Sequence, residues 1–452
     1  MSRVALIGEN SIEYIDKLID IWDNGDCAVL IDWRIPLQTA VEMMHEAEVH
    51  ACCIDKKFFD KVPDALSQSI TFIPFERKTN PVEYLPESIY DKFKPNYSES
   101  EAVILYSSGT TGKSKGIILS HFAINTNADA IIDYMKPNAK DCIYIAKTLS
   151  HSSTLTGELL VSLKTYAKLV IAPTIVPPRF ILNNIKRFNV TIICLNPILL
   201  SMFADEIQCG SYDISSLRTI YVSGSILNDK IYSKAHDTFK EIAIYNVYGL
   251  SEAGPRVTAQ CNGCRSSNSA GKPIQNVEIA IVAENGTSVT NGEHGVVHVN
   301  TPSRFAGYIS GQAKHKSLYK DWLNTGDIGY IDCNGELHIV GRIDDVIILD
   351  AHKIYPGEIE NTILDFTEIA ECVVVKVEYK NNKFIGCLCV GRYVMEQEIK
   401  DKLKNKLPTY EIPRRFIRCD SIPRTLNGKT SKTAVKEKII NAIETEQADD
   451  NK

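Results

Sequence analysis

Long hydrophobic runs are missing from this sequence of 452 residues. No stretch approaches the roughly 18 uninterrupted apolar residues of a membrane-spanning helix, and the opening apolar run is too short for a secretory signal. A surplus of basic charge is also missing: 56 acidic residues against 50 basic ones give a formal charge of −6, which does not suit a nucleic-acid binder. The 13 cysteines are odd in number and scattered, unlike a disulfide framework. We therefore predict a cytoplasmic protein that binds neither membranes nor nucleic acid.

Several common catalytic motifs are absent as well. A Walker loop needs a glycine five positions before its Gly-Lys pair, but those positions hold Ser107 and Pro423. No Gly-x-Gly or Gly-x-Ser-x-Gly occurs, which excludes a dinucleotide fingerprint and a nucleophile elbow. The pair Cys261 and Cys264 has no second pair at zinc spacing, so we interpret it as a loop with two reduced thiols.

Strand-like runs alternate with helical patterns over much of the chain. The first unit combines an apolar run over 4–7, a helix with apolar residues at 12, 15, 18, 19 and 22, and a second run over 27–31. This alternation predicts parallel sheet with helices on its faces. From about Val277, short strands separated by Gly/Asn turns indicate an antiparallel region.

A final block follows Gly341-Arg342. Strand runs over 372–377 and 385–390, with helical patterns near 358–364 and 396–407, predict a small α+β domain. The polar end, 444–452, is expected to be frayed. We therefore predict an α/β protein with two domains. The large N-terminal domain, 1–342, combines parallel sheets, helices and a small antiparallel β region, and the small α+β domain spans 343–452.

The segment from Tyr106 to Gly116, Tyr-Ser-Ser-Gly-Thr-Thr-Gly-Lys-Ser-Lys-Gly, is the most distinctive stretch of the sequence. Glycines allow the backbone to approach a ligand closely, N–H groups and hydroxyls bind phosphate oxygens, and lysines neutralise phosphate charge. This composition predicts a phosphate-binding loop, with a flexible surface loop as the alternative.

The same stretch resembles the signature loop of the acyl-adenylate-forming superfamily, which comprises acyl- and aryl-CoA ligases, adenylation domains of peptide synthetases and firefly-type luciferases. Five further stretches resemble the superfamily's motifs in the expected order, so that six matches cover nearly the whole chain. They are Ser223-Gly224-Ser225, Asn246-Val-Tyr-Gly-Leu-Ser-Glu252, Thr325-Gly326-Asp327, Gly341-Arg342-Ile-Asp344-Asp345 and Pro423-Arg-Thr-Leu-Asn-Gly-Lys429.

The resemblance implies that a carboxylate attacks the α-phosphorus of ATP to form an acyl-adenylate. Glu252 is then expected to bind Mg²⁺ and Lys429 to bridge the carboxylate and the α-phosphate, which makes these two the expected catalytic residues. Asp344 is the expected hinge for rotation of the small, mobile domain. The residues expected to bind ATP or AMP are Ser107, Ser108, Gly109, Thr110, Thr111, Gly112, Lys113, Lys115, Gly224, Ser225, Asn246, Tyr248, Gly249, Ser251, Asp327 and Arg342.

Individual roles also follow from the resemblance. Tyr248 is expected to stack on adenine, Asp327 to accept the ribose hydroxyls and Arg342 to contact ribose or phosphate. Taken alone, Tyr248 also fits a core aromatic, Asp327 a turn residue and Lys429 a solvated surface lysine.

The stretch from Thr148 to Thr154 corresponds to the segment that enters the acid pocket in the superfamily. Peptide-synthetase relatives usually carry an Asp there that pairs with an α-ammonium group, and its absence argues against an ordinary α-amino acid. His151 resembles the pocket or gating histidine of many CoA ligases, and a histidine hydrogen-bonded at a strand end is an equal alternative. The expected acid-pocket residues are His151, Leu155, Asn196, Val222 and Gly254.

The resemblance thus implies an ATP-dependent acid–thiol ligase (AMP-forming) that uses a small carboxylic acid, ATP, Mg²⁺ and coenzyme A. A stand-alone adenylation enzyme, which loads an acyl or amino acid onto the phosphopantetheine of an acyl or peptidyl carrier protein, is the alternative. A nucleotide-binding protein without catalysis is the alternative of another class, and Glu252, Asp327 and Lys429 speak against it. Ile348 and Ala351 stand where relatives commonly have Lys and Gly; Ile348 argues against luciferase-like oxidation, and Ala351 borders the expected pantetheine path.

Overall fold

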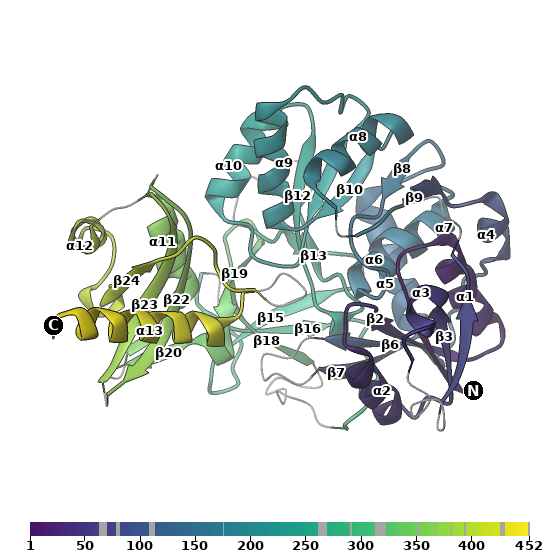
Figure 1. The fold of residues 1–452 in the computed structure, drawn as a ribbon, viewed down its shortest axis with the longest axis horizontal. Helices are drawn as coiled ribbons and strands as arrows, with labels where there is room; N and C mark the ends of the chain where they lie inside the picture. Colours follow the sequence, from purple (N-terminus) through teal and green to yellow (C-terminus); the bar gives the residue numbers. More distant parts are fainter. Residues whose placement is uncertain are drawn as a thin grey trace.

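The computed structural model describes residues 1–62, 70–77, 82–107, 114–174, 176–260, 269–289, 292–311, 322–349, 352–366, 368–380, 382–392, 395–424 and 430–450. Its strands form sheets of seven, eight, four, two and three strands (Figure 1). The expected phosphate-loop residues 108–113, the cysteine pair Cys261 and Cys264, Ala351 and the expected catalytic Lys429 lie outside the described residues.

The first sheet is parallel at its centre. Consecutive strands here are joined by helices, which is the connection that parallel pairing requires. In spatial order it contains β17 (Gly307–Tyr308), β7 (Lys115–Ser120), β6 (Glu101–Ser107), β2 (Cys27–Asp32), β1 (Arg3–Gly8), β3 (Ala51–Asp55) and β4 (Thr71–Phe75). Strands β6, β2, β1, β3 and β4 run parallel, whereas β7 and β17 are antiparallel to their neighbours.

The second sheet has five parallel strands flanked by short antiparallel ones. Its order is β14 (Lys272–Pro273), β13 (Thr258–Ala259), β12 (Ala243–Tyr248), β11 (Thr219–Val222), β10 (Ile192–Leu195), β8 (Cys142–Tyr144), β9 (Lys168–Ile171) and β5 (Glu83–Tyr84). The parallel strands β8 to β11 are almost wholly buried, as expected for a sheet covered on both faces, whereas β12 is only half buried.

The expected antiparallel region and the C-terminal domain complete the sheets. The antiparallel sheet comprises β15 (Glu278–Val282), β16 (Gly295–Asn300), β18 (Leu323–Ile331) and β19 (Leu337–Arg342). A hairpin of β20 (Ile347–Leu349) and β21 (His352–Ile354) leads to the last sheet, β22 (Ile369–Tyr379), β23 (Asn382–Gly391) and β24 (Arg415–Arg418). Figure 1 shows this last sheet and its helices gathered at one end of the molecule, beyond β19. The α/β fold class is thereby confirmed.

Helices cover the parallel sheets and the C-terminal sheet. Several helices have a side-chain cap at their N-terminus. At the start of α1, for example, Ser11 Oγ accepts a hydrogen bond from the Tyr14 amide at 3.1 Å. The longer helices are α1 (Ile12–Asp23), α2 (Leu37–Glu46), α5 (His121–Met135), α8 (Pro178–Phe188), α9 (Pro197–Cys209), α10 (Asp229–Thr238), α11 (Pro356–Leu364), α12 (Glu396–Lys404) and α13 (Lys432–Asp450). The shorter ones are α3 (Lys56–Phe59), α4 (Glu87–Lys92), α6 (Ser152–Thr154), the π-helical turn η2 (Leu155–Leu160), α7 (Val161–Thr165) and the 3₁₀ turns η3 (Ser251–Ala253), η4 (Ile343–Asp345) and η5 (Thr409–Glu411).

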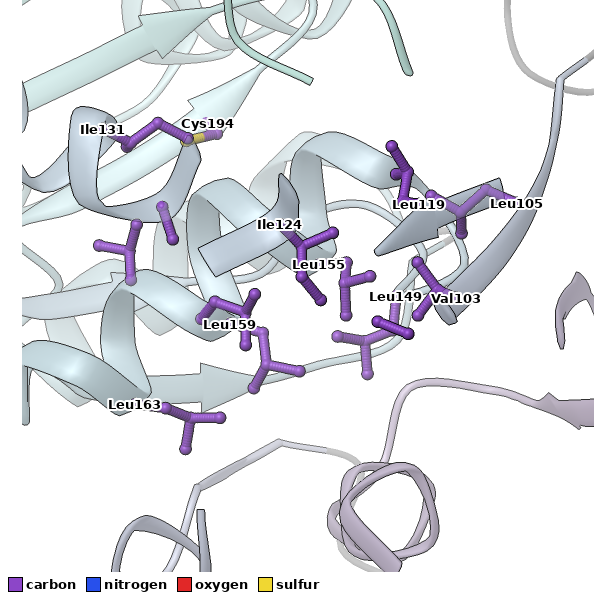
Figure 2. Packing of buried hydrophobic residues seen from close by; sticks show 14 of the residues in the cluster. Val103, Leu105, Leu119, Ile124, Ile131, Leu149, Leu155, Leu159, Leu163 and Cys194 are labelled. Atoms are coloured by element: carbon purple, nitrogen blue, oxygen red, sulfur yellow. The ribbon is translucent and has the colours of Figure 1, made fainter. Parts of the chain in front are cut away.

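The main core lies between the two large sheets. Figure 2 shows leucines of η2 and its surroundings packed with side chains of β6, β7, α5 and β10; those labelled are Val103, Leu105, Leu119, Ile124, Ile131, Leu149, Leu155, Leu159, Leu163 and Cys194. Leu155 and Leu159 are fully buried, so η2 is an interior element. Its position matters because the expected acid-pocket segment runs directly into it.

The C-terminal sheet carries a core on each face. Alternate residues of β22 and β23 face opposite ways, as the two-residue period of a strand requires. One set packs with α11 and α12, and the other packs with Val435, Ile439 and Ile443 of α13. The prediction of a frayed end over 444–452 is therefore wrong in part, since α13 continues to Asp450. Apolar residues four apart hold its earlier turns on the sheet.

Membrane insertion finds no support in the helices. Among the residues that the structure describes, no helix combines the length and the apolar character needed to cross a bilayer.

An ion pair joins the amino ends of three neighbouring parallel strands. Asp141, which precedes β8, accepts hydrogen bonds from Arg218 Nε at 2.8 Å and Nη2 at 3.0 Å and from Thr191 Oγ1 at 2.8 Å. Burial works to raise the pKa of Asp141, but these hydrogen bonds outweigh it, so the pKa lies below its ordinary value. A lowered carboxyl pKa stabilises the fold above the unfolded-state pKa and loses that contribution as the pH falls.

We predict that Arg218→Gln lowers the free energy of unfolding by about 1–3 kcal/mol at neutral pH, because Asp141 keeps its charge and loses its bidentate partner. The deficit should begin to shrink as the pH falls below the unfolded-state carboxyl pKa of about 4, and it should disappear once the pH passes the lower pKa of Asp141 in the fold. Urea denaturation at neutral and at low pH measures it. Arg187→Gln, which removes a cation stacked on Phe188 rather than a carboxylate partner, is the control. An equal deficit at both pH values would contradict the assignment.

Candidate active site

Three strands bring Tyr248, Asp327 and Arg342 into one hydrogen-bonded cluster. Tyr248 ends β12, Asp327 lies within β18, and Arg342 ends β19. The Tyr248 hydroxyl donates to Asp327 Oδ2 at 2.5 Å, and Arg342 Nη1 donates to Asp327 Oδ1 at 2.8 Å and to the Thr325 carbonyl at 3.1 Å. The sequence motifs that carry these residues are thus neighbours in space, as the expected nucleotide site requires.

The cluster is electrostatically matched. Burial raises the pKa of Tyr248, and the Asp327 charge raises it further, so Tyr248 remains a hydroxyl donor. Burial works against the charge on Arg342, but Asp327 outweighs it, and the pKa of Arg342 lies above its ordinary value. The Asp327 carboxylate therefore lies between a phenol and a guanidinium that both donate to it.

A second pair joins Glu252 to an aromatic residue from the other large sheet. The Tyr308 hydroxyl on β17 donates to Glu252 Oε1 at 2.8 Å, and the Phe305 amide donates to the Glu252 carbonyl at 2.9 Å. Lys115 Nζ lies 5.1 Å from the centre of the Tyr308 ring. Burial raises the pKa of Tyr308, Glu252 raises it further, and Arg342 partly opposes this, so the two clusters share one electrostatic environment. The sequence analysis missed Tyr308, because nothing in the residues around it indicates this contact.

Glu252 fits the expected metal ligand. Tyr308 occupies Oε1, while Oε2 has no hydrogen-bond partner among the described residues. A carboxylate oxygen oriented by a phenol is a donor that Mg²⁺ accepts, with phosphates and water completing its coordination. Within the described residues no group of three metal-ligating side chains occurs.

At two positions near Glu252 the backbone leaves no room for a side chain, which explains the glycines there. A β-carbon on Gly249 would lie 1.9 Å from the Pro255 carbonyl oxygen. Gly254 has φ of +90°, and a β-carbon there would lie 2.6 Å from the Ser303 carbonyl oxygen. Between them, Ser251 Oγ is 2.8 Å from Ser152 Oγ, which connects this turn to the expected acid-pocket segment.

Other expected nucleotide-site residues have less direct places. The side-chain amide of Asn246 donates to the Ser269 carbonyl at 2.9 Å, and its backbone amide donates to Gln260 Oε1 at 2.9 Å. Asn246 therefore holds the backbone at Ser269 next to β12. Gly224 has φ of +98° in the turn after β11, and Ser225 is exposed there. Ser107 pairs with Lys115 through the β6–β7 ladder. Their contacts with a nucleotide stay predictions.

The structure does not gather the expected acid-pocket residues into one group: Leu155 on η2 packs in the main core, whereas Val222 at the end of β11 packs in a second core with Leu195. Leu155 and Val222 are fully buried and apolar. Asn196 caps α9, where its Oδ1 accepts from the Leu199 amide at 2.8 Å. His151 Nδ1 lies 3.1 Å from Ser153 Oγ and 3.4 Å from the Ser153 amide. The His151 ring is thus held against the first residues of α6, next to η2.

The expected hinge residue lies between two bodies. Asp344 belongs to η4, directly after β19. Across this junction Lys230 donates to the Ile369 carbonyl, Lys353 pairs with Glu284, and His294 Nε2 lies 3.7 Å from Glu358 Oε1. A cavity of about 170 Å³ lies between α10 and α11. Partly exposed polar contacts of this kind contribute little to stability.

The chain belongs to the family of AMP-binding enzymes: the family model matches residues 1–309, and the model of the AMP-binding enzyme C-terminal domain matches residues 358–429. This confirms the acyl-adenylate-forming superfamily and makes the chain an AMP-forming acid–thiol ligase by class. It is 27% identical to the indoleacetate–CoA ligase of Aromatoleum aromaticum over 99% of this chain and 90% of that one. It is 26% identical to the 2-succinylbenzoate–CoA ligase of Enterococcus faecalis over 95% of this chain and 87% of that one.

Solved structures share the fold. ATP-bound MatB from Rhodopseudomonas palustris superposes with a TM-score of 0.86 at 23% identity, covering 97% of this chain and 88% of that chain. The anthranilate CoA ligase AuaEII in complex with anthranoyl-AMP superposes with a TM-score of 0.83 at 20% identity, covering 98% and 88%.

We predict that Tyr308→Phe raises the Mg²⁺ concentration for half-maximal ATP–pyrophosphate exchange by about 10- to 100-fold, because Glu252 loses the donor that orients it. Titration of Mg²⁺ at fixed ATP measures the shift. Tyr90→Phe is the matched control, since its hydroxyl donates to the Ala167 carbonyl away from the site. An unchanged Mg²⁺ dependence in Tyr308→Phe would show that Glu252 does not hold the metal.

Proposed function

We propose that the protein activates a carboxylic acid with ATP and transfers the acyl group to the thiol of coenzyme A. The observation that carries the proposal is that residues of separate motifs lie together: Arg342 pairs with Asp327, and it also acts electrostatically on Tyr308, which donates to Glu252. Relatives named CoA ligases align over nearly the full chain. The acid and the acceptor are parts of the proposal.

The first half-reaction joins two anions, so positive charge must be placed between them. A carboxylate oxygen forms a bond to the α-phosphorus, the bond to the β-phosphate oxygen breaks, and pyrophosphate leaves. Mg²⁺, when bound, neutralises phosphate charge. Asp327 would accept ribose hydroxyls, Arg342 would contact the ribose or phosphate, and Glu252 would hold the metal. Lys429 would bridge the carboxylate and the α-phosphate.

The second half-reaction needs a different face of the small domain, residues 343–452. We propose that this domain rotates about Asp344, which removes Lys429 and admits the thiol. Polar contacts across the junction involve Lys230, Lys353 and His294. Because water can replace their partners at little cost in free energy, these contacts support such a rotation. The thiolate attacks the acyl carbon, the bond to the adenylate oxygen breaks, and AMP leaves.

A carrier protein is the other acceptor to consider. Ile348 on β20 is 61% exposed, so a large apolar side chain is presented to solvent on the hairpin that follows the hinge. Such a residue suits contact with another protein, although single exposed apolar residues are common. Free coenzyme A remains the leading acceptor because the CoA ligases align over the whole chain.

The direct test is ATP–pyrophosphate exchange against a panel of aliphatic, aromatic and amino acids. The acid that supports exchange is then offered with coenzyme A or with a phosphopantetheinylated carrier protein, and thioester formation is measured by mass spectrometry. Exchange with an acid, followed by transfer to coenzyme A, is expected. Exchange without transfer to coenzyme A but with transfer to the carrier would select the alternative; absence of exchange with every acid would overturn adenylation.

We predict that Lys429→Ala lowers the exchange rate by about 10²-fold or more, the effect of removing one aimed charge. Thioester formation from synthetic acyl-adenylate should be largely preserved, because the lysine would have left the site. Lys436→Ala, an exposed lysine on α13, is the matched control. Equal losses in both half-reactions would contradict rotation of the domain.

A further inference from the structure

Two buried charged side chains and a third that is partly buried lie next to the expected acid-pocket segment. We call Lys147, Glu158 and Arg256 the buried charge cluster. Glu158 is fully buried on η2, and Arg256 is only 4% exposed. Lys147 Nζ lies 3.1 Å from Glu158 Oε1. None of these three residues entered the sequence analysis, and the adenylation chemistry of the nucleotide end does not use them.

The cluster is continuous with the acid-pocket segment. Lys147 Nζ donates to Ser153 Oγ at 3.2 Å, and Ser153 Oγ lies 3.1 Å from His151 Nδ1. Arg256 follows Gly254 by two residues, and its Nη2 would lie 3.1 Å from a β-carbon on Gly157. The glycine at 157 therefore leaves room for the guanidinium against η2.

The surroundings of the cluster are apolar. The position of a β-carbon on Gly157 is 3.7 Å from Ile131, and Figure 2 shows Ile131 beside Cys194, with Leu155 and Leu159 further along the same packed layer. The charges of Glu158, Lys147 and Arg256 all act on the Cys194 thiol, whose pKa burial raises. Charges in such an environment are weakly screened and need close partners.

The cluster has one positive charge too many. It holds two cations and one carboxylate, and burial works to raise the pKa of Glu158, which weakens even that compensation. Among the described residues, no second carboxylate forms an ion pair with Lys147 or Arg256. An uncompensated buried cation is costly, and a ligand that carries a negative charge would remove the cost.

Hydrogen-bond donors without an acceptor also indicate a missing anionic ligand. Arg256 Nε and the Tyr134 hydroxyl are buried and have no hydrogen-bond partner among the described residues. Tyr134 lies close enough to Arg256 for the guanidinium to influence its titration. A guanidinium presents its donors on separate edges, so the edge that carries Nε remains for another acceptor while Nη2 faces η2.

We propose that Arg256 binds a second, distal carboxylate of the acid substrate, so that the enzyme selects dicarboxylic acids; this inference rests on the proposed adenylation of an acid. One carboxylate reacts at the nucleotide end, near Glu252 and Ser251. The other accepts hydrogen bonds from Arg256 Nε and Tyr134 at the far end of the same pocket and balances the buried charge cluster.

The test compares a series of dicarboxylic acids of increasing length with their monomethyl esters in ATP–pyrophosphate exchange. We expect kcat/KM to favour the free diacid by about 10²-fold at the best length, because the site has buried donors that the ester leaves poorly paired. Arg256→Gln should remove that preference, mainly by raising KM for the diacid, and should leave the monoester unchanged.

Two further variants separate binding from folding. Glu158→Gln with Arg256→Gln keeps the net charge of the cluster and avoids a carboxylate without its guanidinium; it should also lose the preference for diacids. Arg218→Gln, which loses an arginine–carboxylate pair elsewhere in the same sheet, should keep it. Melting temperature with and without the diacid gives a readout independent of catalysis, and only proteins that retain Arg256 should be stabilised.

Each outcome decides between the ideas. Equal use of diacid and monoester by the wild type, or an unchanged preference in both Arg256 variants, would overturn the inference and leave adenylation standing, with Arg256 as an internal partner of Glu158. A diacid that raises the melting temperature through Arg256 without supporting exchange would overturn the proposed function and leave the carboxylate site standing.

Discussion

The Asp327 carboxylate joins strands from two different sheets. It lies on β18, accepts a hydrogen bond from the Tyr248 hydroxyl on β12, and forms an ion pair with Arg342 on β19. Without it, a buried phenol would lose its acceptor and a half-buried guanidinium would keep only the Thr325 carbonyl, and such losses are costly. The carboxylate thus adds a side-chain connection to the backbone hydrogen bonds between Ala270, Gly271 and Leu337, which also join the antiparallel sheet to the parallel one.

Much of the fold could be predicted from the sequence because parallel strands buried on both faces leave unbroken apolar runs. The run over 27–31 and the strand β2 (Cys27–Asp32) agree closely. Asp327 shows the limit: it resembles a turn residue in sequence, yet it lies in a nine-residue strand whose pairing is irregular after Ile328. Helix α13 was missed although Val435, Ile439 and Ile443 repeat at helical spacing, because its polar residues outnumber them.

The site could be predicted only where its residues lie within recognisable motifs. Tyr308 contacts Glu252 from 56 positions away, and neither its neighbours nor its spacing indicates that contact. Lys147, Glu158 and Arg256 are similar: each resembles a surface charge in the sequence, and only the folded chain buries Glu158 and Arg256 and brings Lys147 against Glu158. Pairings through space between distant segments carry no local pattern, so they become visible only in the folded chain.

One short segment connects the two ends of the site. It contains Tyr248 and Glu252, which are proposed to bind the nucleotide and its metal, and Arg256, which is proposed to bind the acid. Its turn is locked, since added side chains at Gly249 or Gly254 would collide with backbone. A rigid connection of this kind fixes the separation between the metal-binding carboxylate and the guanidinium. If a substrate carboxylate reacts beside one while its second carboxylate is held by the other, the acid must match that separation, and the backbone of this segment, rather than the apolar walls, sets the length that the enzyme accepts.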